Sequence, residues 1–330
     1  MSTLLKRSIP SGGKNWRDAI QWGGAFAGFL LLAHVLARIG KERLLNAFQA
    51  MAWSLPIAFL LDGLRIACDA WSTRLVLGEV GRKLNWRPLL QAQLMAHAVM
   101  NLLPAGRAAG EALKALLFQR TIGGSVATAM AAINQALVFA SSAIFALLCG
   151  VVTLHKLGAS WLGWAIVLHG STLALAAFGL RAATLLRSPI EGIVLRFPRL
   201  REAVIRFFDS SRLFPPLPWF PVVAMMLGRT AQSLQHAVLA KALGVSIEGA
   251  TPFVLEGIHL LGAATGVLVP GQIGTGELTF ELAAQALQIE AVTAVSIALG
   301  AHLSSYLWAF VGLLSLLFWR SFDFTEKKQV

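Results

Sequence analysis

Runs of apolar residues long enough to cross a lipid bilayer recur along the whole chain. A membrane-spanning helix needs about 20 mostly apolar residues. Six segments meet that requirement, at 19–39, 48–70, 125–151, 160–184, 219–241 and 291–319. The pattern therefore predicts an all-α, polytopic membrane protein with about six spanning helices.

Two further apolar stretches, at 89–119 and 251–289, are interrupted near their middle. The first contains Leu103-Pro104-Ala105-Gly106 and the second contains Val269-Pro270-Gly271-Gln272-Ile273-Gly274. Proline inside a helix removes a hydrogen bond and clashes with the preceding turn. The resulting half-helices are too short to cross a membrane separately. We therefore expect two re-entrant helical hairpins, whose broken backbone is buried in protein or lines a cavity.

The two interruptions resemble each other. The segment from Pro104 to Glu111 aligns without gaps on the segment from Pro270 to Glu277, and Pro, Gly and Glu coincide at the first, seventh and eighth positions. Each follows two predicted spans and precedes one. This order predicts an inverted repeat within a single membrane domain, 1–330, and a substrate site near the midplane. The repeat halves are about 15–152 and 158–320, and the expected break residues are Pro104, Gly106, Gly110, Pro270, Gly271, Gly274 and Gly276.

Composition and charge support a membrane protein and give its orientation. Of the 330 residues, 56% are hydrophobic and 13% are charged, whereas about a quarter are charged in soluble domains. This excludes an ordinary cytosolic enzyme, a disordered chain and a coiled coil. With the N-terminus inside and both hairpins returning to their own side, 19 basic residues fall on the inside and five on the outside. The positive-inside rule therefore predicts that both termini are cytoplasmic.

The predicted cytoplasmic segment 187–214 is rich in arginine. After Pro198, the apolar residues recur at helical spacing and the charged residues occupy the other face. The pattern is typical of an interfacial amphipathic helix on an anionic leaflet, or of a basic connector that only follows the topology. The apolar residues are Leu200, Ala203, Val204, Phe207 and Phe208, and the charged residues are Arg199, Arg201, Glu202, Arg206 and Asp209.

Ionisable residues cluster after the first break. Arg107, Glu111 and Lys114 share one helix face. Arg107 either clamps a phosphate bidentately or neutralises Glu111. Free N–H groups at the start of each half-helix favour an anion such as a lipid phosphate. Glu111 and Glu277 either complement the helix dipole, with Thr275 as N-cap of the second half-helix, or carry protons or repel the anion in one state.

Four other sets of polar residues lie inside the predicted spans and the second hairpin. Asp62, Arg65 and Asp69 share one face and form an ion triad that either pins its helix or contacts substrate. Arg229 faces either an acidic bundle partner (Glu256, Glu277 or Glu281) or an anionic ligand. Glu277 and Glu281, one turn apart, share a proton or meet a basic residue of another helix. Glu256 and His259 are candidates for a proton relay.

Motifs for cofactor or metal chemistry are missing from the sequence. The seven histidines have no HExxH spacing, and Cys68 and Cys149 lie in apolar runs without a CxxC partner, so they are expected core residues. No phosphate-binding loop, dinucleotide fingerprint or GxSxG elbow is present. We expect no metal, no cofactor, no nucleic-acid partner and no enzymatic activity.

The motifs around the breaks resemble a known family. Asn101-Leu-Leu-Pro104 followed by Gly110-Glu111, Leu64-Arg65, and Val269-Pro-Gly271 with Gly274 and Glu277 are similar to the transmembrane region of bacterial lysylphosphatidylglycerol synthases. This flippase-like family also includes hopanoid-associated and archaeal glycosylation-associated members. The family usually has Gly-Gly where this chain has Ala109-Gly110, and Gly-Gly-Leu-Gly-Val where it has Gly271-Gln-Ile-Gly-Thr275. These differences concern the substrate more than the fold.

The resemblance implies a protein of the bacterial plasma (inner) membrane that translocates an anionic phospholipid or a polyprenyl-phosphate lipid, with protons rather than ATP as the energy source if transport is coupled. Arg107, Arg229 and Asn101 are then expected to bind substrate, and Glu111, Glu277 and Glu281 to gate or carry protons. The aminoacyl-transfer domain is absent from this sequence, so we do not expect this chain to make lysyl-lipid. The alternatives are a non-catalytic membrane partner of a lipid-synthesis enzyme and an integral membrane enzyme acting on lipid-linked substrates.

Overall fold

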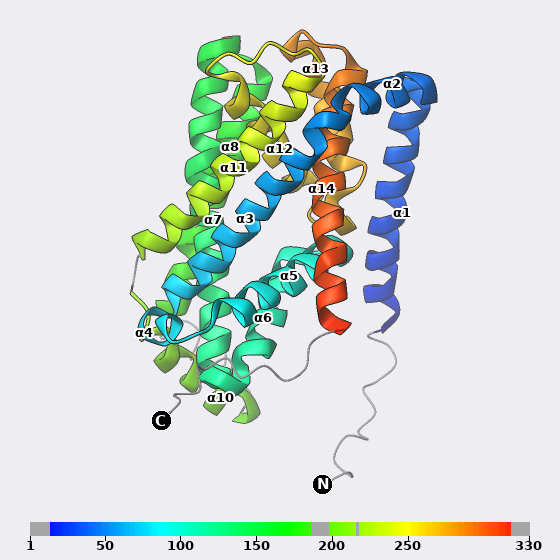
Figure 1. Ribbon diagram of the computed structural model, residues 1–330. Coiled ribbons are helices and arrows are strands. Elements are labelled where there is room, and N and C mark those ends of the chain that lie inside the picture. Colours follow the sequence, from blue (N-terminus) through cyan, green and yellow to red (C-terminus); the bar gives the residue numbers. More distant parts are fainter. Residues whose placement is uncertain (1–13, 186–197, 216–217, 318–330) are drawn as a thin grey trace.

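The computed structural model describes residues 14–185, 198–215 and 218–317, and within these ranges the regular elements are helices joined by short connections (Figure 1). The predicted all-α class is therefore confirmed. The helices are α1 (Lys14–Ile39), α2 (Lys41–Met51), η2 (Ala52–Ser54), α3 (Leu55–Val76), α4 (Gly78–Arg82), α5 (Trp86–Leu102), α6 (Gly106–Ile122), α7 (Gly124–Leu157), α8 (Trp161–Leu185), α10 (Pro198–Ser211), α11 (Trp219–Ala242), α12 (Thr251–Thr265), η3 (Pro270–Gln272), α13 (Thr275–Leu287) and α14 (Ala291–Leu317).

Four helical segments of the described chain are long and apolar enough to cross a membrane, and each overlaps a predicted span. They are Lys41–Val76, Gly124–Leu157, Trp161–Leu185 and Ala291–Leu316. In α1 the apolar helix Ala25–Ile39 overlaps the predicted span 19–39, and the side chains of residues 14–22 and 24 lie outside the described part of the chain. The remaining predicted span, 219–241, is less apolar than expected. In α11 the buried face carries polar side chains, which lower its hydropathy: Gln232, Ser233, Gln235 and His236.

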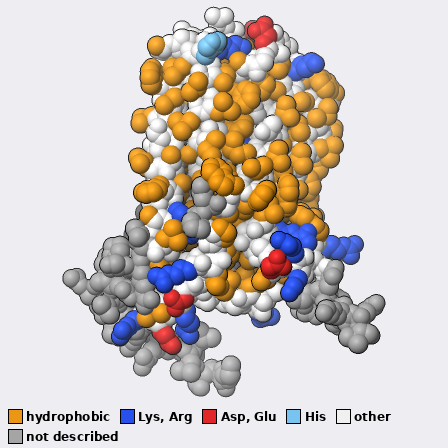
Figure 2. Space-filling model, turned by 90° about the vertical axis from the view of Figure 1, so that its left-hand side faces the viewer, with side chains coloured by type: hydrophobic (Ala, Val, Ile, Leu, Met, Phe, Trp, Pro, Cys, Tyr) orange, Lys and Arg blue, Asp and Glu red, His pale blue; other side chains and the backbone are white. Residues whose placement is uncertain are grey.

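The outer surface matches a protein embedded in lipid. Figure 2 shows hydrophobic side chains over the middle of the visible face and charged side chains near its two ends. Large apolar side chains such as Phe178 and Leu175 on α8 and Phe220 on α11 are among the most exposed. Such a surface is unfavourable in water and favourable against acyl chains.

Both interrupted stretches form a pair of short helices, as predicted. The pair α5 and α6 lies in the half of the molecule that holds α4 and α10, and the pair α12 and α13 lies in the half that holds α2 (Figure 1). The first break passes through Ala105, whose φ of 50° is left-handed, and the second through Gly271 and Gly274, with φ of 58° and 82°. A side chain on Gly106 would meet the Met100 carbonyl. The glycines therefore permit the turn and the close approach of the two limbs.

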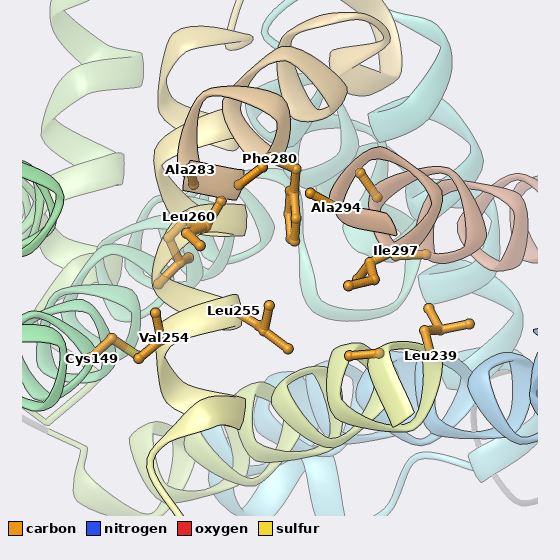
Figure 3. Packing of buried hydrophobic residues seen from close by; sticks show 14 of the residues in the cluster. Cys149, Leu239, Val254, Leu255, Leu260, Phe280, Ala283, Ala294 and Ile297 are labelled. Atoms are coloured by element: carbon orange, nitrogen blue, oxygen red, sulfur yellow. The ribbon is translucent and has the colours of Figure 1, made fainter. Parts of the chain in front are cut away.

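The core sits where the broken pairs meet the long helices. α3 packs along α11, α5 packs against α14, and α12 packs against α7. Figure 3 shows the second pair enclosed in this way: Leu255 and Leu260 of α12 and Phe280 of α13 point towards side chains of α7, α11 and α14. Cys68 and Cys149 are buried free thiols, as expected of core cysteines.

Helix α10 forms part of the predicted amphipathic segment, whose residues 187–197 lie outside the described residues. Arg201, Glu202 and Arg206 are exposed, whereas Phe208 is buried and Phe207 packs on the core. The apolar face therefore packs in part against α7 and α8. The sequence pattern left a helix on the lipid surface and a basic connector as alternatives, because hydrophobic periodicity does not distinguish contact with protein from contact with lipid.

Candidate functional site

Three arginines from three helices converge on a small cavity in the interior. We call it the arginine cavity; its lining residues are Arg65, Asp69, Arg107, Ser141, Met225, Gly228 and Arg229. Its volume is about 10 Å³, close to the smallest space that holds one water molecule. Arg107 and Arg229, both predicted to bind substrate, are thus brought together, with Arg65 as the third cation.

The predicted triad on α3 forms and extends to the first break. The Arg65 Nε lies 2.7 Å from Asp62 Oδ1, and the Arg65 Nη1 lies 3.8 Å from Asp69 Oδ2. The same Asp69 oxygen lies 3.5 Å from Arg107 Nη2. Asp69 therefore bridges two arginines. Arg107 does not neutralise Glu111, which pairs instead with Lys114 at 2.8 Å.

Arg229 has several partners from other parts of the bundle. It donates to Gln232 Oε1 at 2.9 Å and to Ser142 Oγ at 2.7 Å. Its Nη1 lies 3.7 Å from Glu256 Oε1. Of the three acidic candidates, Glu256 is thus its partner. The other Glu256 oxygen lies 3.0 Å from His236 Nδ1, so a chain of polar contacts runs from the cavity into α12.

The charges around the arginine cavity balance. Asp62, Asp69 and Glu256 stand against the three arginines, and buried ions that are paired in this way avoid the high free energy of an isolated buried charge. One donor of the cluster is left, because the buried Arg107 Nε has no hydrogen-bond partner in the part of the chain that the structure describes. A guanidinium presents a planar fork of donors that fits phosphate. The cluster is therefore suited to exchange a carboxylate for a phosphate.

A buried polar network adjoins the first break. Lys114 donates to Gln93 Oε1 at 3.2 Å and to Thr73 Oγ1 at 3.4 Å, and Asn134 donates to the same Thr73 oxygen at 3.1 Å. Glu111 Oε2 has no hydrogen-bond partner. Thr73, Gln93 and Asn134 come from three different helices, and none of them was predicted as a site residue. Their only signal was polarity within apolar runs.

Glu277 is bonded differently from Glu111. Its Oε2 accepts the Gly274 N–H at 2.8 Å, and its Oε1 lies 2.8 Å from His302 Nδ1 of α14. The expectation that Thr275 is the N-cap was wrong. Gly274 holds that position with φ of 82°, and the Thr275 hydroxyl donates to the Gln272 carbonyl at 2.9 Å. This geometry fits the first of the two predicted roles of Glu277, in which its carboxylate complements the positive end of the α13 helix dipole.

The two breaks are in direct contact. The Ala105 N–H donates to the Val267 carbonyl at 3.0 Å. Tyr306 of α14 donates to the Gly271 carbonyl at 3.3 Å, and a side chain on Gly28 of α1 would collide with Val269 and with the Ile273 carbonyl. Part of the irregular backbone is therefore covered by α1 and α14, whereas the side chains of Leu102, Leu103, Val267 and Leu268 are exposed. A membrane tolerates irregular backbone where it is buried in protein or lines a cavity.

The remaining predicted site residues lie apart from the arginine cavity. Glu281 pairs with Arg38 of α1 at 3.0 Å, so Glu277 and Glu281 each meet a basic residue of another helix and do not pair with each other. Asn101 donates to the His97 carbonyl at 2.9 Å and accepts from Ser305 at 3.4 Å. It does not line the arginine cavity. His259 contacts Gln232 at 3.0 Å.

These features define a multi-pass helical membrane protein whose two interrupted helix pairs meet beside a buried cluster of arginines and carboxylates. A family model described as the lysylphosphatidylglycerol synthase TM region matches residues 20–314. The chain belongs to this family, as the motifs indicated. Neither a curated protein nor a solved structure matches significantly. Within the described ranges, no group of three or more His, Cys, Asp or Glu side chains is placed to hold a metal ion.

Proposed function

We propose that this protein translocates a lipid with a phosphate group, an anionic phospholipid or a polyprenyl-phosphate lipid, across the bacterial inner membrane. The observation that carries the proposal is the convergence of Arg65, Arg107 and Arg229 on one cavity beside the broken helices. Intramembrane arginines are rare and mark ligand pathways. The family, which includes flippase-like members, supports the same function.

The packing of the helices supports an inverted repeat. In the proposed repeat, α3 corresponds to α11, α5 to α12, α6 to α13 and α7 to α14. A two-fold axis would then exchange α3 with α11, and it would exchange the α5–α14 contact with the α12–α7 contact. Those contacts all form.

We propose six spans, with α5–α6 and α12–α13 as re-entrant hairpins from opposite sides and both termini cytoplasmic. Basic residues gather at the end with α4 and α10: Arg74, Arg82, Lys83, Arg87, Arg120, Arg181, Arg201, Arg206 and Arg212.

The arginine cavity, at about 10 Å³, is too small for a phosphate group, so transport requires it to widen. An arriving phosphate would compete with Asp69 for Arg107 and with Glu256 for Arg229, and the carboxylates would close the site again when phosphate leaves. Glu111 and Glu281 each keep one oxygen without a hydrogen-bond partner among the described residues. Of the two, Glu111 lies on the same helix as Arg107 and is the better placed proton-carrying or gating residue. Glu277 and Glu281 would contribute through their contacts with His302 and Arg38. On this proposal the protein is a transporter and not an enzyme.

The test is translocation of fluorescent phospholipids in proteoliposomes. We expect the protein to accelerate translocation, and Arg107→Gln or Arg229→Gln to reduce the rate about tenfold, as for the loss of one charge-assisted contact. Arg82→Gln is the matched control, because the Arg82 side chain is 77% exposed. A rate equal to that of empty liposomes for every phosphate-bearing lipid tried would refute the proposal.

A second candidate is a non-catalytic partner of a lipid-synthesis enzyme. The description of the family, a region of a synthase, favours it. Stable co-purification with such an enzyme, together with no translocation by the pure protein, would establish that role in place of transport.

A further inference from the structure

A chain of hydrogen bonds leads from the arginine cavity to His259 of α12. Arg229 donates to Gln232 Oε1 at 2.9 Å, and the Gln232 amide nitrogen lies 3.0 Å from His259 Nε2. Because a guanidinium can only donate, the orientation of the Gln232 amide is fixed and its nitrogen must donate to His259. His259 Nε2 is therefore the unprotonated nitrogen, and the ring holds its single proton on Nδ1.

His236 of α11 and Glu256 of α12 form a fully buried pair beside this chain. His236 Nδ1 lies 3.0 Å from Glu256 Oε2, and both side chains are 0% exposed. The centroid of the His236 ring lies 4.8 Å from that of His259 and 5.9 Å from that of Phe280. An ionised carboxylate can only accept, so the His236 Nδ1–H donates to Glu256. The His236 Nε2 then carries a free lone pair, because it has no hydrogen-bond partner among the described residues.

Glu256 is shared between this histidine and the arginine cavity. Its Oε1 lies 3.7 Å from Arg229 Nη1, so one carboxylate contacts both a residue proposed to bind phosphate and an imidazole. In this arrangement the charges of Arg229 and Glu256 balance and His236 is neutral. A phosphate that binds Arg229 takes the place of the carboxylate and leaves Glu256 buried with His236 alone. A buried charge that loses its partner is strongly unfavourable, and a proton on the His236–Glu256 pair removes the excess negative charge.

Asp69, the other carboxylate at the arginine cavity, does not undergo the same change. It lies 3.8 Å from Arg65 and 3.5 Å from Arg107, so it keeps one arginine when a phosphate occupies the other. Glu256 makes a direct ion pair with one arginine in the part of the chain that the structure describes. The charge that phosphate binding leaves uncompensated therefore falls on the His236–Glu256 pair.

Other ionisable groups of the surrounding helices act on the pair or on its neighbours Arg229 and His259. Arg65 already contacts Asp62 at 2.7 Å, and His302 contacts Glu277 at 2.8 Å. His236 is the titratable group in direct contact with Glu256, so the compensating proton is expected there. The surrounding groups are Arg65 of α3, Cys149 and Lys156 of α7, His169 of α8, Glu277 of α13 and His302 of α14.

We propose that His236 and Glu256 form a proton-binding site coupled to the arginine cavity, so that one proton enters with each phosphate group and leaves with it. The proton comes from water on the side where the cavity opens and binds the His236 Nε2 lone pair. It returns to water when the phosphate leaves and Arg229 contacts Glu256 again, and no covalent bond of the protein or the lipid breaks. A phosphodiester is thereby carried without net charge. The inference rests on the proposed function and adds the ion that is transported with the lipid.

The experiment imposes a pH gradient on proteoliposomes that hold the full chain and a fluorescent phosphatidylglycerol. The pH outside is lower by about one unit, equal potassium and valinomycin hold the membrane potential at zero, and quenching from outside reports the outer leaflet. We expect about tenfold more probe in the inner leaflet than in the outer one, because a tenfold gradient of a co-transported ion balances a tenfold gradient of the lipid. Protein-free liposomes give the baseline. Accelerated translocation with an equal distribution would overturn the proton site.

Variants assign the coupling to the pair. His236→Asn keeps an N–H donor near the position of Nδ1 but cannot bind a proton, so the ratio between the leaflets should fall to about one. His34→Gln is the control, because His34 on α1 is exposed. Accumulation that persists in His236→Asn would overturn the inference, and so would accumulation that is lost in Glu111→Gln alone, which would place the proton on Glu111.

A measurement on the wild-type protein needs no substitution and covers the case in which His236→Asn does not fold. Nitrogen-15 spectra of the histidine rings are recorded with and without dihexanoyl phosphatidylglycerol. We expect the probe to convert one neutral ring to imidazolium. Unchanged rings in the presence of bound probe would overturn the proton site.

The two assays separate this inference from the proposed function. A ring that becomes charged when the probe binds, without translocation of any lipid, would sustain the proton site and refute transport. Translocation without accumulation would sustain transport and refute the proton site. Neither binding nor translocation of the probe would overturn both.

Discussion

The backbone N–H of Ala105 donates a hydrogen bond to the carbonyl of Val267, at 3.0 Å, and this bond joins the two breaks of the membrane domain. Residues in the first break are thereby tied to residues in the second. Arg107 follows Ala105 by two positions, so movement of either break would move a cation of the arginine cavity. The bond therefore couples the position of one helix pair to that of the other.

Ala105→Gly is expected to stabilise the protein. Ala105 has φ of 50°, a conformation that disfavours a Cβ by about 1 kcal/mol and that glycine adopts freely. The thermal unfolding midpoint in detergent should therefore rise. Ala112→Gly, in regular helix on α6, is the matched control and should lower the midpoint, by roughly 1 kcal/mol in stability. A lower midpoint for Ala105→Gly would show that the left-handed conformation is not strained.

Gly276→Ala is expected to disturb the Glu277 contact. A Cβ at this position would lie 2.8 Å from His302 Cε1, so His302 must move away from Glu277. Overpacking of this kind destabilises by about 1 to 3 kcal/mol, which thermal unfolding measures. Gly179→Ala, on α8, is the control, because nothing lies within 4 Å of its Cβ position. Equal midpoints for the two variants would show that His302 can shift without loss.

Much of this architecture follows from the sequence. Apolar length predicted the α3, α7, α8 and α14 spans, and Pro104 and Pro270 marked both breaks, because proline acts on the helix that contains it. Partners one turn apart, such as Asp62 and Arg65, were also found, because helical periodicity places them on one face. A basic partner of Glu281 on another helix was one of two predicted alternatives, but its identity as Arg38 was not predicted. The cavity lined by α6, α7, α8 and α10 was not predicted either. They depend on how distant helices pack, which local periodicity does not encode.

The pairing of Asp69 with Arg107 can be measured by a double-mutant cycle. Asp69→Asn should destabilise the protein by roughly 3 kcal/mol, because Arg65 and Arg107 lose their shared carboxylate. Arg107→Gln should restore part of this stability in the Asp69→Asn background, with an interaction free energy of about 1 kcal/mol or more. The measurement is the thermal midpoint of all four proteins. Additive effects would mean that the two side chains do not interact despite the 3.5 Å separation.

Arg229→Lys distinguishes a guanidinium fork from a positive charge. Arg229 uses two nitrogens to reach Gln232 and Ser142 while Glu256 lies at 3.7 Å. An ammonium keeps the charge but cannot reproduce that planar set of bonds. We expect Arg229→Lys to lower lipid translocation nearly as much as Arg229→Gln does, by about tenfold, whereas Arg82→Lys should leave it unchanged. If Arg229→Lys translocates lipid at the wild-type rate, the site requires only charge, and the bidentate fit to phosphate is not part of its mechanism.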